Sequence, residues 1–258
     1  MATAKEIEQK IFAWAPKELA EDWDNVGLLI GGSPREVRKV LVSLDVTEAV
    51  ADEAIRIGAQ LIVSHHPVMN CAWHEVQSLR EDDWQGHLLR KLVKNDLSVI
   101  CMHTNLDAAS GGVNDVLAQK LGLEHPEPFN DEKIGRIGTL SCALPLEQFL
   151  QSVIESLDSN GIRYIAGSGM VKKVAVGGGA CRDFIPEVIA AGCDTYVTAD
   201  LRYNDFLDTK GLNLIDAGHF PTENVVCGAI VSYLKEAYPA MEIVQTTSHT
   251  KEVIQYYK

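Results

Sequence analysis

The stretch VRKVLVSLDVTEAVADEAIRIGAQLIVSHH, residues 37–66, aligns without gaps on VKKVAVGGGACRDFIPEVIAAGCDTYVTAD, residues 171–200. Each copy has an apolar β-branched run, then a helical pattern, then a second apolar run. Gly58 and Gly192 occupy the matching positions after the helical patterns, where a left-handed backbone favours glycine. Strand, helix and strand at this spacing predict a parallel βαβ unit in each half of the chain.

Working outward from the two copies, the same alternation continues. Further strands are expected at 97–104 and 212–219, and helices at 48–57, 84–95, 113–121, 145–160, 183–191 and 223–237. The fold class predicted is α/β, with two similar three-layer domains built on mixed, mostly parallel sheets. We place the first domain at 1–126 plus 215–258 and the second at 127–214. The segment LEHPEPFND (123–131) is the most linker-like, and a strand within 241–257 is expected to return to the first half.

Composition excludes several classes of protein. The net charge of -13 and the absence of a Lys/Arg cluster argue against sequence-independent nucleic-acid binding. No apolar run approaches the roughly 20 residues that cross a bilayer. The N-terminus instead reads as an amphipathic helix capped by Thr3, so we expect a cytoplasmic protein that does not bind membranes. The six cysteines show no CxxC spacing and are interpreted as reduced thiols.

Metal-ligand side chains follow three of the predicted strands: SHHP (64–67), HTNLD (103–107) and GHFPTE (218–223). The carboxyl ends of parallel strands meet at one sheet edge, where open α/β sheets bind ligands. Imidazole and carboxylate suit zinc, manganese, iron or nickel. This number of ligands exceeds the need of one tetrahedral ion and points to two divalent ions. The ligands expected are His65, His66, Asp107, His219 and Glu223.

Each segment also has a simpler interpretation. The histidine pair could hydrogen-bond to the backbone at a strand end, and Asp107 could form an Asx turn. Glu223 could serve only the dipole of helix 223–237, with Thr222 as its N-cap. His103 could be a ligand, an outer partner of a ligand or a proton carrier. The turn GGGACRD (177–183) could hold an anion or be a tight turn, and His74, His87, His125 and His249 are expected in solvent.

The combination of SHHP, HTNLDAASGGVND (103–115) and DAGHFPTEN (216–224) resembles the NIF-three-like family of dinuclear-metal proteins, also named GTP cyclohydrolase I type 2 homologues. The resemblance runs from WDNVGLLIG (23–31) to residue 224. It implies a two-domain α/β fold, with the middle of the chain as the second domain, and a toroidal homohexamer. It also implies that the five residues above are the ligands, with Asp107 and Glu223 as bridges.

The resemblance implies a metal-dependent hydrolase acting on GTP or a related nucleotide. In the mechanism that we expect, two divalent ions ionise a bridging water and His103 is the catalytic proton carrier. Attack of water on C8 of guanine or on phosphorus would use the same centre. The alternative is a non-catalytic, metal-loaded scaffold or regulatory interaction protein. A nucleotide sensor that uses the glycine turn is a third reading.

Overall fold

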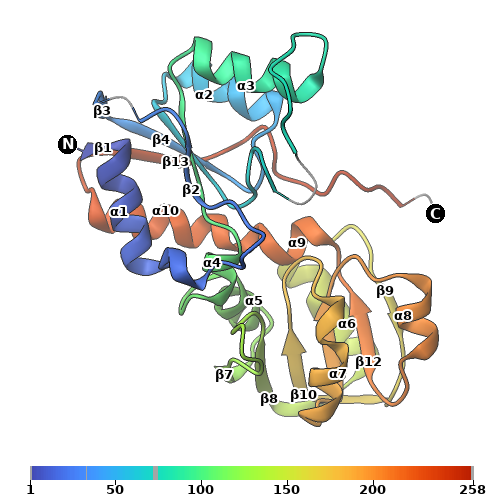
Figure 1. The fold of residues 1–258 in the computed structure, drawn as a ribbon. Helices are drawn as coiled ribbons and strands as arrows, with labels where there is room; N and C mark the ends of the chain where they lie inside the picture. Colours follow the sequence, from blue (N-terminus) through green and yellow to red (C-terminus); the bar gives the residue numbers. More distant parts are fainter. Residues whose placement is uncertain (1, 33, 72–74, 257–258) are drawn as a thin grey trace. The chain divides into compact units, whose positions relative to one another are not determined.

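The computed structural model describes every residue except 1, 33, 72–74, 257 and 258. The chain divides into two compact units. Unit 1 comprises residues 1–110 and 227–250, and unit 2 comprises residues 111–226 and 251–258. Each unit has its own sheet and its own helices (Figure 1). None of the described helices has the length and apolar character that a membrane crossing requires.

The sheet of unit 1 has the strand order β13-β4-β5-β6-β2 in the described chain. Four of these strands run parallel, and β2 pairs antiparallel with β6. A short antiparallel ladder also joins β1 (Ala2–Thr3) to β3 (Glu36–Val37). The sheet strands are β2 (Gly27–Ile30), β4 (Lys39–Ser43), β5 (Leu61–Ser64), β6 (Ser98–Cys101) and β13 (Glu242–Gln245). The predicted parallel βαβ unit is confirmed, and β13 confirms that the C-terminal segment returns to the first half.

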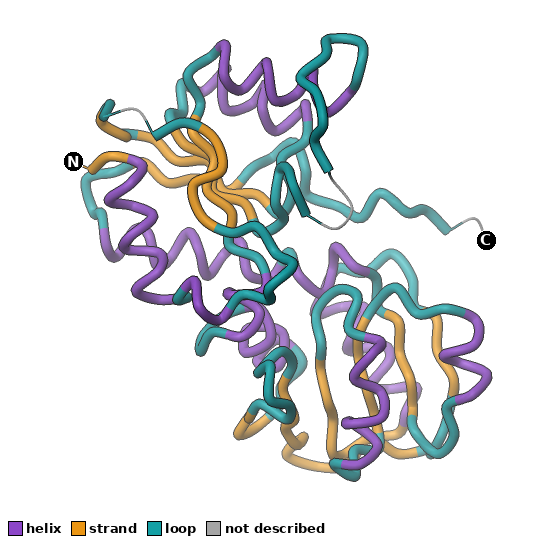
Figure 2. Tube along the Cα trace, viewed as in Figure 1, coloured by secondary structure: helices purple, strands orange, loops and turns teal. Residues whose placement is uncertain are grey.

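Helices cover both faces of this sheet (Figures 1 and 2). On one face, α2 and α3 pack their buried side chains against Leu41, Ile62 and Val99. On the other face, α1 buries Ile7 and Ile11 completely. The helices are α1 (Ala4–Trp14), η1 (Lys17–Leu19), α2 (Glu48–Ile57), α3 (Trp84–Lys94), α4 (Thr104–Ala108) and α10 (Val225–Ala237). Three layers result, as predicted for this half.

The sheet of unit 2 has the order β7-β8-β10-β11-β12-β9 in the described chain. β10, β11 and β12 run parallel, whereas β7, β8 and β9 join by antiparallel pairing. The strands are β7 (Glu124–Glu127), β8 (Arg136–Pro145), β9 (Arg163–Ile165), β10 (Met170–Val176), β11 (Thr195–Thr198) and β12 (Asn213–Asp216). The second copy of the repeat is therefore also a parallel βαβ unit, with antiparallel strands added on both sides.

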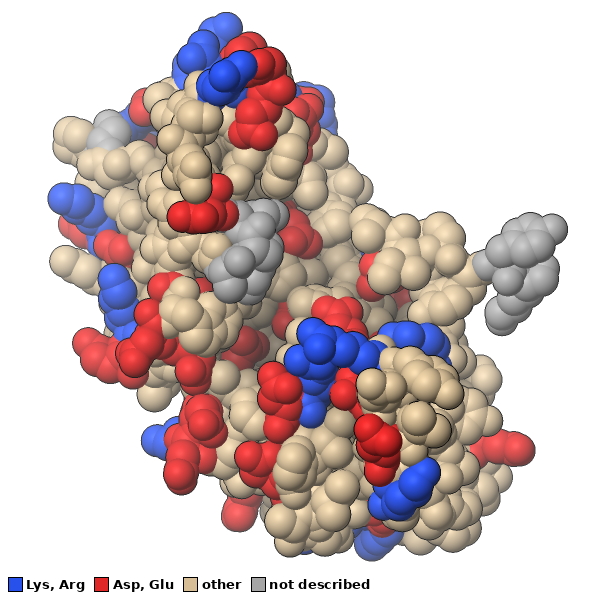
Figure 3. Space-filling model, turned by 45° about the vertical axis from the view of Figure 1, so that its right-hand side comes forward, with Lys and Arg blue, Asp and Glu red and all other residues tan. Residues whose placement is uncertain are grey.

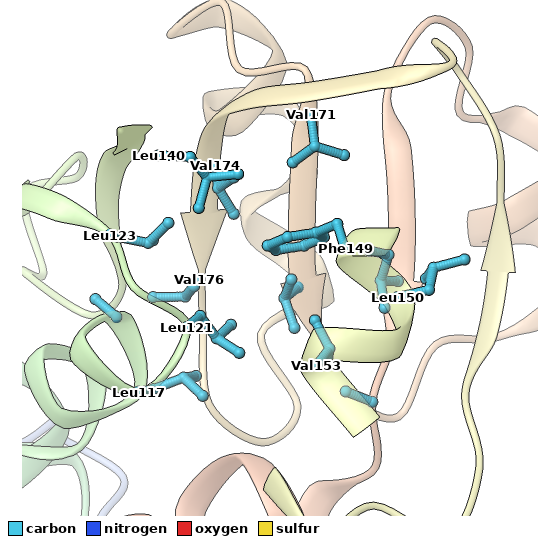
Figure 4. Packing of buried hydrophobic residues seen from close by; sticks show 14 of the residues in the cluster. Leu117, Leu121, Leu123, Leu140, Phe149, Leu150, Val153, Val171, Val174 and Val176 are labelled. Carbon is cyan, nitrogen blue, oxygen red and sulfur yellow. The ribbon is translucent and has the colours of Figure 1, made fainter. Parts of the chain in front are cut away.

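Alternate residues of β10 serve the two faces of this sheet. Val174 and Val176 contact the side chains of α5 and α6, and Phe149 is fully buried in that layer (Figure 4). Ala175 faces the opposite layer, which contains Val188 of α7. The helices are α5 (Val113–Lys120), α6 (Leu146–Leu157), η2 (Arg182–Phe184), α7 (Ile185–Ala190), α8 (Tyr203–Asp208) and α9 (His219–Glu223).

The α/β fold class with mixed sheets is confirmed, and the structure adds detail that the sequence did not supply. The compact unit 2 begins at Gly111, and its helix α5 packs on the sheet of unit 2. The segment expected to be a linker contributes β7, which pairs with β8. The expected N-cap role of Thr222 is wrong. Glu223 ends the separate short helix α9, and the Thr222 hydroxyl bonds to carbonyl oxygens of the preceding turn.

Candidate metal centre

Two histidines follow β5 at the carboxyl end of the unit 1 sheet. The backbone N–H groups of His65 and His66 both bond to the carbonyl of Leu44, so the chain leaves the regular ladder there. Successive strand residues would point to opposite faces. The two imidazole centroids nevertheless lie only 5.1 Å apart. The turn before Pro67 therefore brings both rings to the same side, as the sequence required for a shared site.

The imidazoles of unit 1 are oriented by oxygen acceptors on Nδ1. His65 Nδ1 lies 2.7 Å from the carbonyl oxygen of Met102, and His66 Nδ1 lies 2.7 Å from Asp45 Oδ1. A carbonyl or ionised carboxylate can only accept, so the proton resides on Nδ1. The imidazole lone pair is then on Nε2. This arrangement is typical of histidines that ligate metals, whose second ring nitrogen is held by carbonyl or carboxylate oxygen.

His103 joins the same cluster from the segment after β6. Its Nδ1 lies 2.9 Å from Asp24 Oδ1, and its ring centroid lies 5.2 Å from that of His65. His65, His66 and His103 each offer a ligand atom, and these atoms lie within 4.8 Å of one another. The three side chains could thus hold a metal ion. Asp107 in α4 lies beside them, with Oδ1 3.7 Å from His65 Nε2.

The orienting carboxylates are ionised. Burial would raise the pKa of Asp24, but hydrogen bonds from His103 and Thr104 outweigh burial and lower it to about 2. The pKa of Asp45 is likewise well below its usual range, because its bonds to His249 and His66 outweigh burial. Burial dominates for His103 and lowers its pKa. The histidine cluster is therefore flanked by the ionised carboxylates of Asp24 and Asp45, and His103 within it is neutral.

Unit 2 contributes a second group, at the carboxyl end of its parallel strands. His219 follows β12, and its Nδ1 lies 2.7 Å from Asp200 Oδ2. Its Nε2 lies 2.9 Å from Oε2 of Glu223, whose side chain is buried. Burial alone would lower the pKa of His219, but Glu223 and Asp200 raise it to about 11. In the metal-free protein, His219 thus carries a proton on Nε2 at the position where a cation would replace it.

The glycine turn after β10 lies against the side chains of His219 and Glu223. A Cβ atom on Gly179 would be 2.0 Å from Glu223 Oε1, and its φ of +62° is also left-handed. The N–H groups of Gly178 and Gly179 donate to Asn114 Oδ1 and Thr222 Oγ1. These donors are already used within the protein, which favours the tight turn over the anion site. The turn makes room for Glu223.

Two carboxylates, Asp45 and Asp200, were missed in the sequence, and one histidine was misread, whereas Asp24 was expected to face the pocket. His249 was expected in solvent, but its Nε2 lies 2.8 Å from Asp45 Oδ2 and its side chain is only 13% exposed. Asp45 lies 21 residues before His66, so local spacing gave no signal. Asp200 could have been found, because it occupies the position of His66 in the second copy. His87 and His125 are exposed or half-exposed, and His74 lies outside the described residues.

The donor chemistry of both groups fits divalent metal ions. Unit 1 supplies imidazole nitrogens and the buried carboxylate of Asp107, and unit 2 supplies the imidazole of His219 and the buried carboxylate of Glu223. Buried charge of this kind requires a partner cation or a proton. Each group therefore offers side chains that could hold a metal ion.

The chain is similar to several known proteins. The family model described as Duf34/NIF3 (NGG1p interacting factor 3) matches residues 2–252. A GTP cyclohydrolase 1 type 2 homolog from Clostridium perfringens is 33% identical over 231 residues, covering 86% of this chain and 87% of the relative. A protein with the same name from Streptomyces coelicolor is 34% identical over 251 residues, covering 92% and 87%. The crystal structure of a Bacillus cereus protein related to NIF3 has a TM-score of 0.91, with 26% identity and coverage of 99% and 100%.

Proposed function

This chain belongs to the Duf34/NIF3 family, and from that membership we propose that it is a dinuclear-metal hydrolase acting on GTP or a related nucleotide. The reaction class follows the relatives named GTP cyclohydrolase 1 type 2 homolog. Unit 1 and unit 2 each supply part of the proposed ligand set. The proposed ligands are His65, His66, Asp107, His219 and Glu223.

One observation supports the proposal most strongly. Four histidines each direct Nδ1 at an oxygen acceptor: His65 at Met102, His66 at Asp45, His103 at Asp24 and His219 at Asp200. A histidine that only caps a strand end would bond to the backbone, as His65 does, whereas three of these four acceptors are carboxylates. The repeated arrangement favours ligation through Nε2 of His65, His66 and His219, and it also orients Nε2 of His103.

A pair of divalent ions would lower the pKa of water from about 15.7 toward 7 and polarise the substrate. His103 is proposed to take the proton of the attacking water at Nε2, since burial lowers its pKa and keeps it neutral. The Asp24 carboxylate on Nδ1 stabilises the imidazolium that results. Asp24 is itself held by the Thr104 N–H, at 3.0 Å, so the base is fixed in orientation.

The charge of the protein also bears on the substrate. On the face shown in Figure 3, Asp and Glu side chains are widely spread, and Lys and Arg side chains stand beside them in small groups. With a net charge of -13, a nucleotide fits better than a nucleic-acid backbone, because two ions can hold one phosphate group locally. The metal identity is left open among zinc, manganese, iron and nickel. The toroidal homohexamer remains a prediction, which light scattering of the purified protein tests.

The proposal is tested by metal-dependent hydrolysis of GTP. Formate release reports attack at C8 of guanine, and phosphate release reports attack at phosphorus. Asp107→Ala and Glu223→Ala should abolish turnover while far-ultraviolet circular dichroism stays unchanged. Asp52→Ala, which removes an exposed carboxylate on α2, is the matched control and should retain full activity. Turnover by Asp107→Ala in the absence of metal would rule the mechanism out.

A second candidate function comes from the family description, which names an interacting factor. In that case the same ligands would hold ions in a non-catalytic scaffold. Bound metal without turnover of any nucleotide would favour this function. A coordination shell with water-filled positions would favour catalysis, since structural shells are closed.

A further inference from the structure

Asp45 holds two histidines at once, one on each carboxylate oxygen. Oδ1 accepts from His66 Nδ1 at 2.7 Å, and Oδ2 lies 2.8 Å from His249 Nε2. His66 belongs to the proposed ligand set, but His249 does not and lies 204 residues after Asp45. The side chain of Asp45 is 36% exposed, so packing alone leaves it room to rotate. A second hydrogen bond on Oδ2 would restrict that rotation.

The segment that carries His249 is itself tightly fixed. It follows β13, and the Thr246 N–H continues the ladder to the carbonyl oxygen of Val42 at 2.8 Å. The buried carboxylate of Glu53 then accepts from the Thr247 N–H, the Thr247 hydroxyl and the Ser248 N–H, all at 2.7–3.1 Å. An anion that collects this many donors anchors the chain firmly. His249 is therefore presented to Asp45 by a rigid backbone rather than by a mobile terminus.

We propose that His249 is a positioning residue of the metal centre. By donating to Oδ2, it fixes the Asp45 carboxylate so that Oδ1 faces His66 Nδ1, and this sets the direction of His66 Nε2. The inference rests on the proposed metal-binding function. It assigns the C-terminal segment of unit 1 a role in that site, through a His249–Asp45–His66 chain.

Substitution of His249 in the full-length chain tests the role, with Co(II) as the probe. His249→Leu keeps the bulk but removes the donor, whereas His249→Gln keeps an N–H donor that can reach Oδ2. His87→Leu is the matched control, because His87 also pairs with a carboxylate, Glu81, at 2.9 Å but on the exposed side of α3. The readouts are Co(II) affinity by chelator competition, the visible Co(II) spectrum, and the unfolding temperature of the metal-free protein.

We expect His249→Leu to weaken Co(II) binding by roughly 3- to 10-fold, less than the 10- to 100-fold typical of direct outer-shell partners. Its Co(II) spectrum should shift, and His249→Gln should restore both properties. If His249→Leu lowers the metal-free unfolding temperature, His249→Asn, whose amide is too short to reach, replaces it.

Four results would overturn the proposal. His249→Leu could bind Co(II) with wild-type affinity and spectrum, or His249→Gln could be as impaired as His249→Leu. Absence of Co(II) binding by the unchanged protein would overturn the metal centre itself, and with it the positioning role. A loss in His87→Leu equal to that in His249→Leu would likewise show that the effect is not specific.

Discussion

The two βαβ copies place different chemistry at the same point. In unit 1, β5 is followed by His65 and His66, whereas in unit 2, β11 is followed by Ala199 and Asp200. His66 is a candidate ligand oriented by a carboxylate. Asp200 is the orienting carboxylate for another candidate ligand, His219, which follows the next strand.

The earlier turn of each copy differs in a complementary way. Asp45 follows β4 and orients His66, and the matching Gly179 follows β10 and leaves space for Glu223. The same scaffold thus serves either the ligands or the groups around them. In both copies these residues follow the carboxyl ends of parallel strands. The residue type decides whether such a residue can be a metal ligand or can only orient or accommodate one.

The largest expected effect comes from adding a Cβ atom at Gly179, whose counterpart Asp45 carries a side chain. Gly179→Ala places Cβ within 2.0 Å of Glu223 Oε1, so Glu223 must move. We expect metal affinity to fall by more than about 100-fold, beyond the loss of an outer-shell partner. The left-handed φ adds about 1–2 kcal/mol of strain to the folded state. Chelator competition and urea unfolding measure the two effects.

Gly192→Ala is the control for that strain. Gly192 has a φ of +72° but no atom within 4 Å of its Cβ position. It should lose similar stability while retaining metal affinity. Equal metal affinities in the two variants would show that the turn does not make room for Glu223.

The next largest effect is expected from removing the charge of either orienting carboxylate, Asp45 or Asp200. Asp45→Asn and Asp200→Asn should each weaken metal binding by roughly 10- to 100-fold. The loss of metal affinity should be smaller for Asp200→Asn, because the Asp200 side chain is 49% exposed against 36% for Asp45. Isothermal titration with Zn(II) measures both losses. A loss confined to Asp45→Asn would mean that Asp200 does not orient a metal ligand.

The comparison also predicts opposite protonation in the metal-free protein. The pKa of His219 is raised to about 11, whereas burial lowers the pKa of His103 below its usual 6.5. At pH 8, imidazole ¹⁵N spectra should show charged His219 and neutral His103, with the His103 proton on Nδ1. A neutral His219 at pH 8 would contradict the ion pair with Glu223.

The same shifts act on stability in opposite directions. The contribution of His219 is fully present below pH 6.5 and is lost as the pH rises through about 11. His103 destabilises the fold as the pH falls below 6.5, because the unfolded state takes up its proton more readily. Urea unfolding of the metal-free protein between pH 5 and 11 measures these contributions. The variants His219→Gln and His103→Gln, unfolded in the same way, separate the contribution of His219 from that of His103.

The smallest effect concerns the helices of the two copies. Thr47 caps α2 by accepting from the Val50 N–H at 3.2 Å, whereas Cys181 at the matching position makes no side-chain cap. Thr47→Ala should cost about 1 kcal/mol of unfolding free energy. Cys181→Ala should cost less in the same urea experiment. A larger cost at Cys181 would show that capping does not distinguish the copies.

Much of this molecule could be predicted because its repeats are periodic. The apolar runs fixed the parallel strands, and the glycine after α2 marked its end. The antiparallel additions β2 and β9 were not predicted, because they are short and their pairing partners lie far along the chain. The candidate ligands cluster in three motifs, so sequence alone could name them. The pair Asp45 and His249 could not be named, since these residues meet only through the sheet register of β4 and β13.

Metal analysis of the wild-type chain tests the central claim most directly, namely that these oriented histidines and buried carboxylates hold metal ions. The protein is purified without chelators or affinity nickel, and bound metal is counted by mass spectrometry. We expect about two ions per chain, as in two-metal sites, and loss of bound metal in the His65→Ala/His66→Ala and His219→Ala/Glu223→Ala double variants. Wild-type protein that binds no metal, even after incubation with zinc, manganese, iron or nickel, would contradict it.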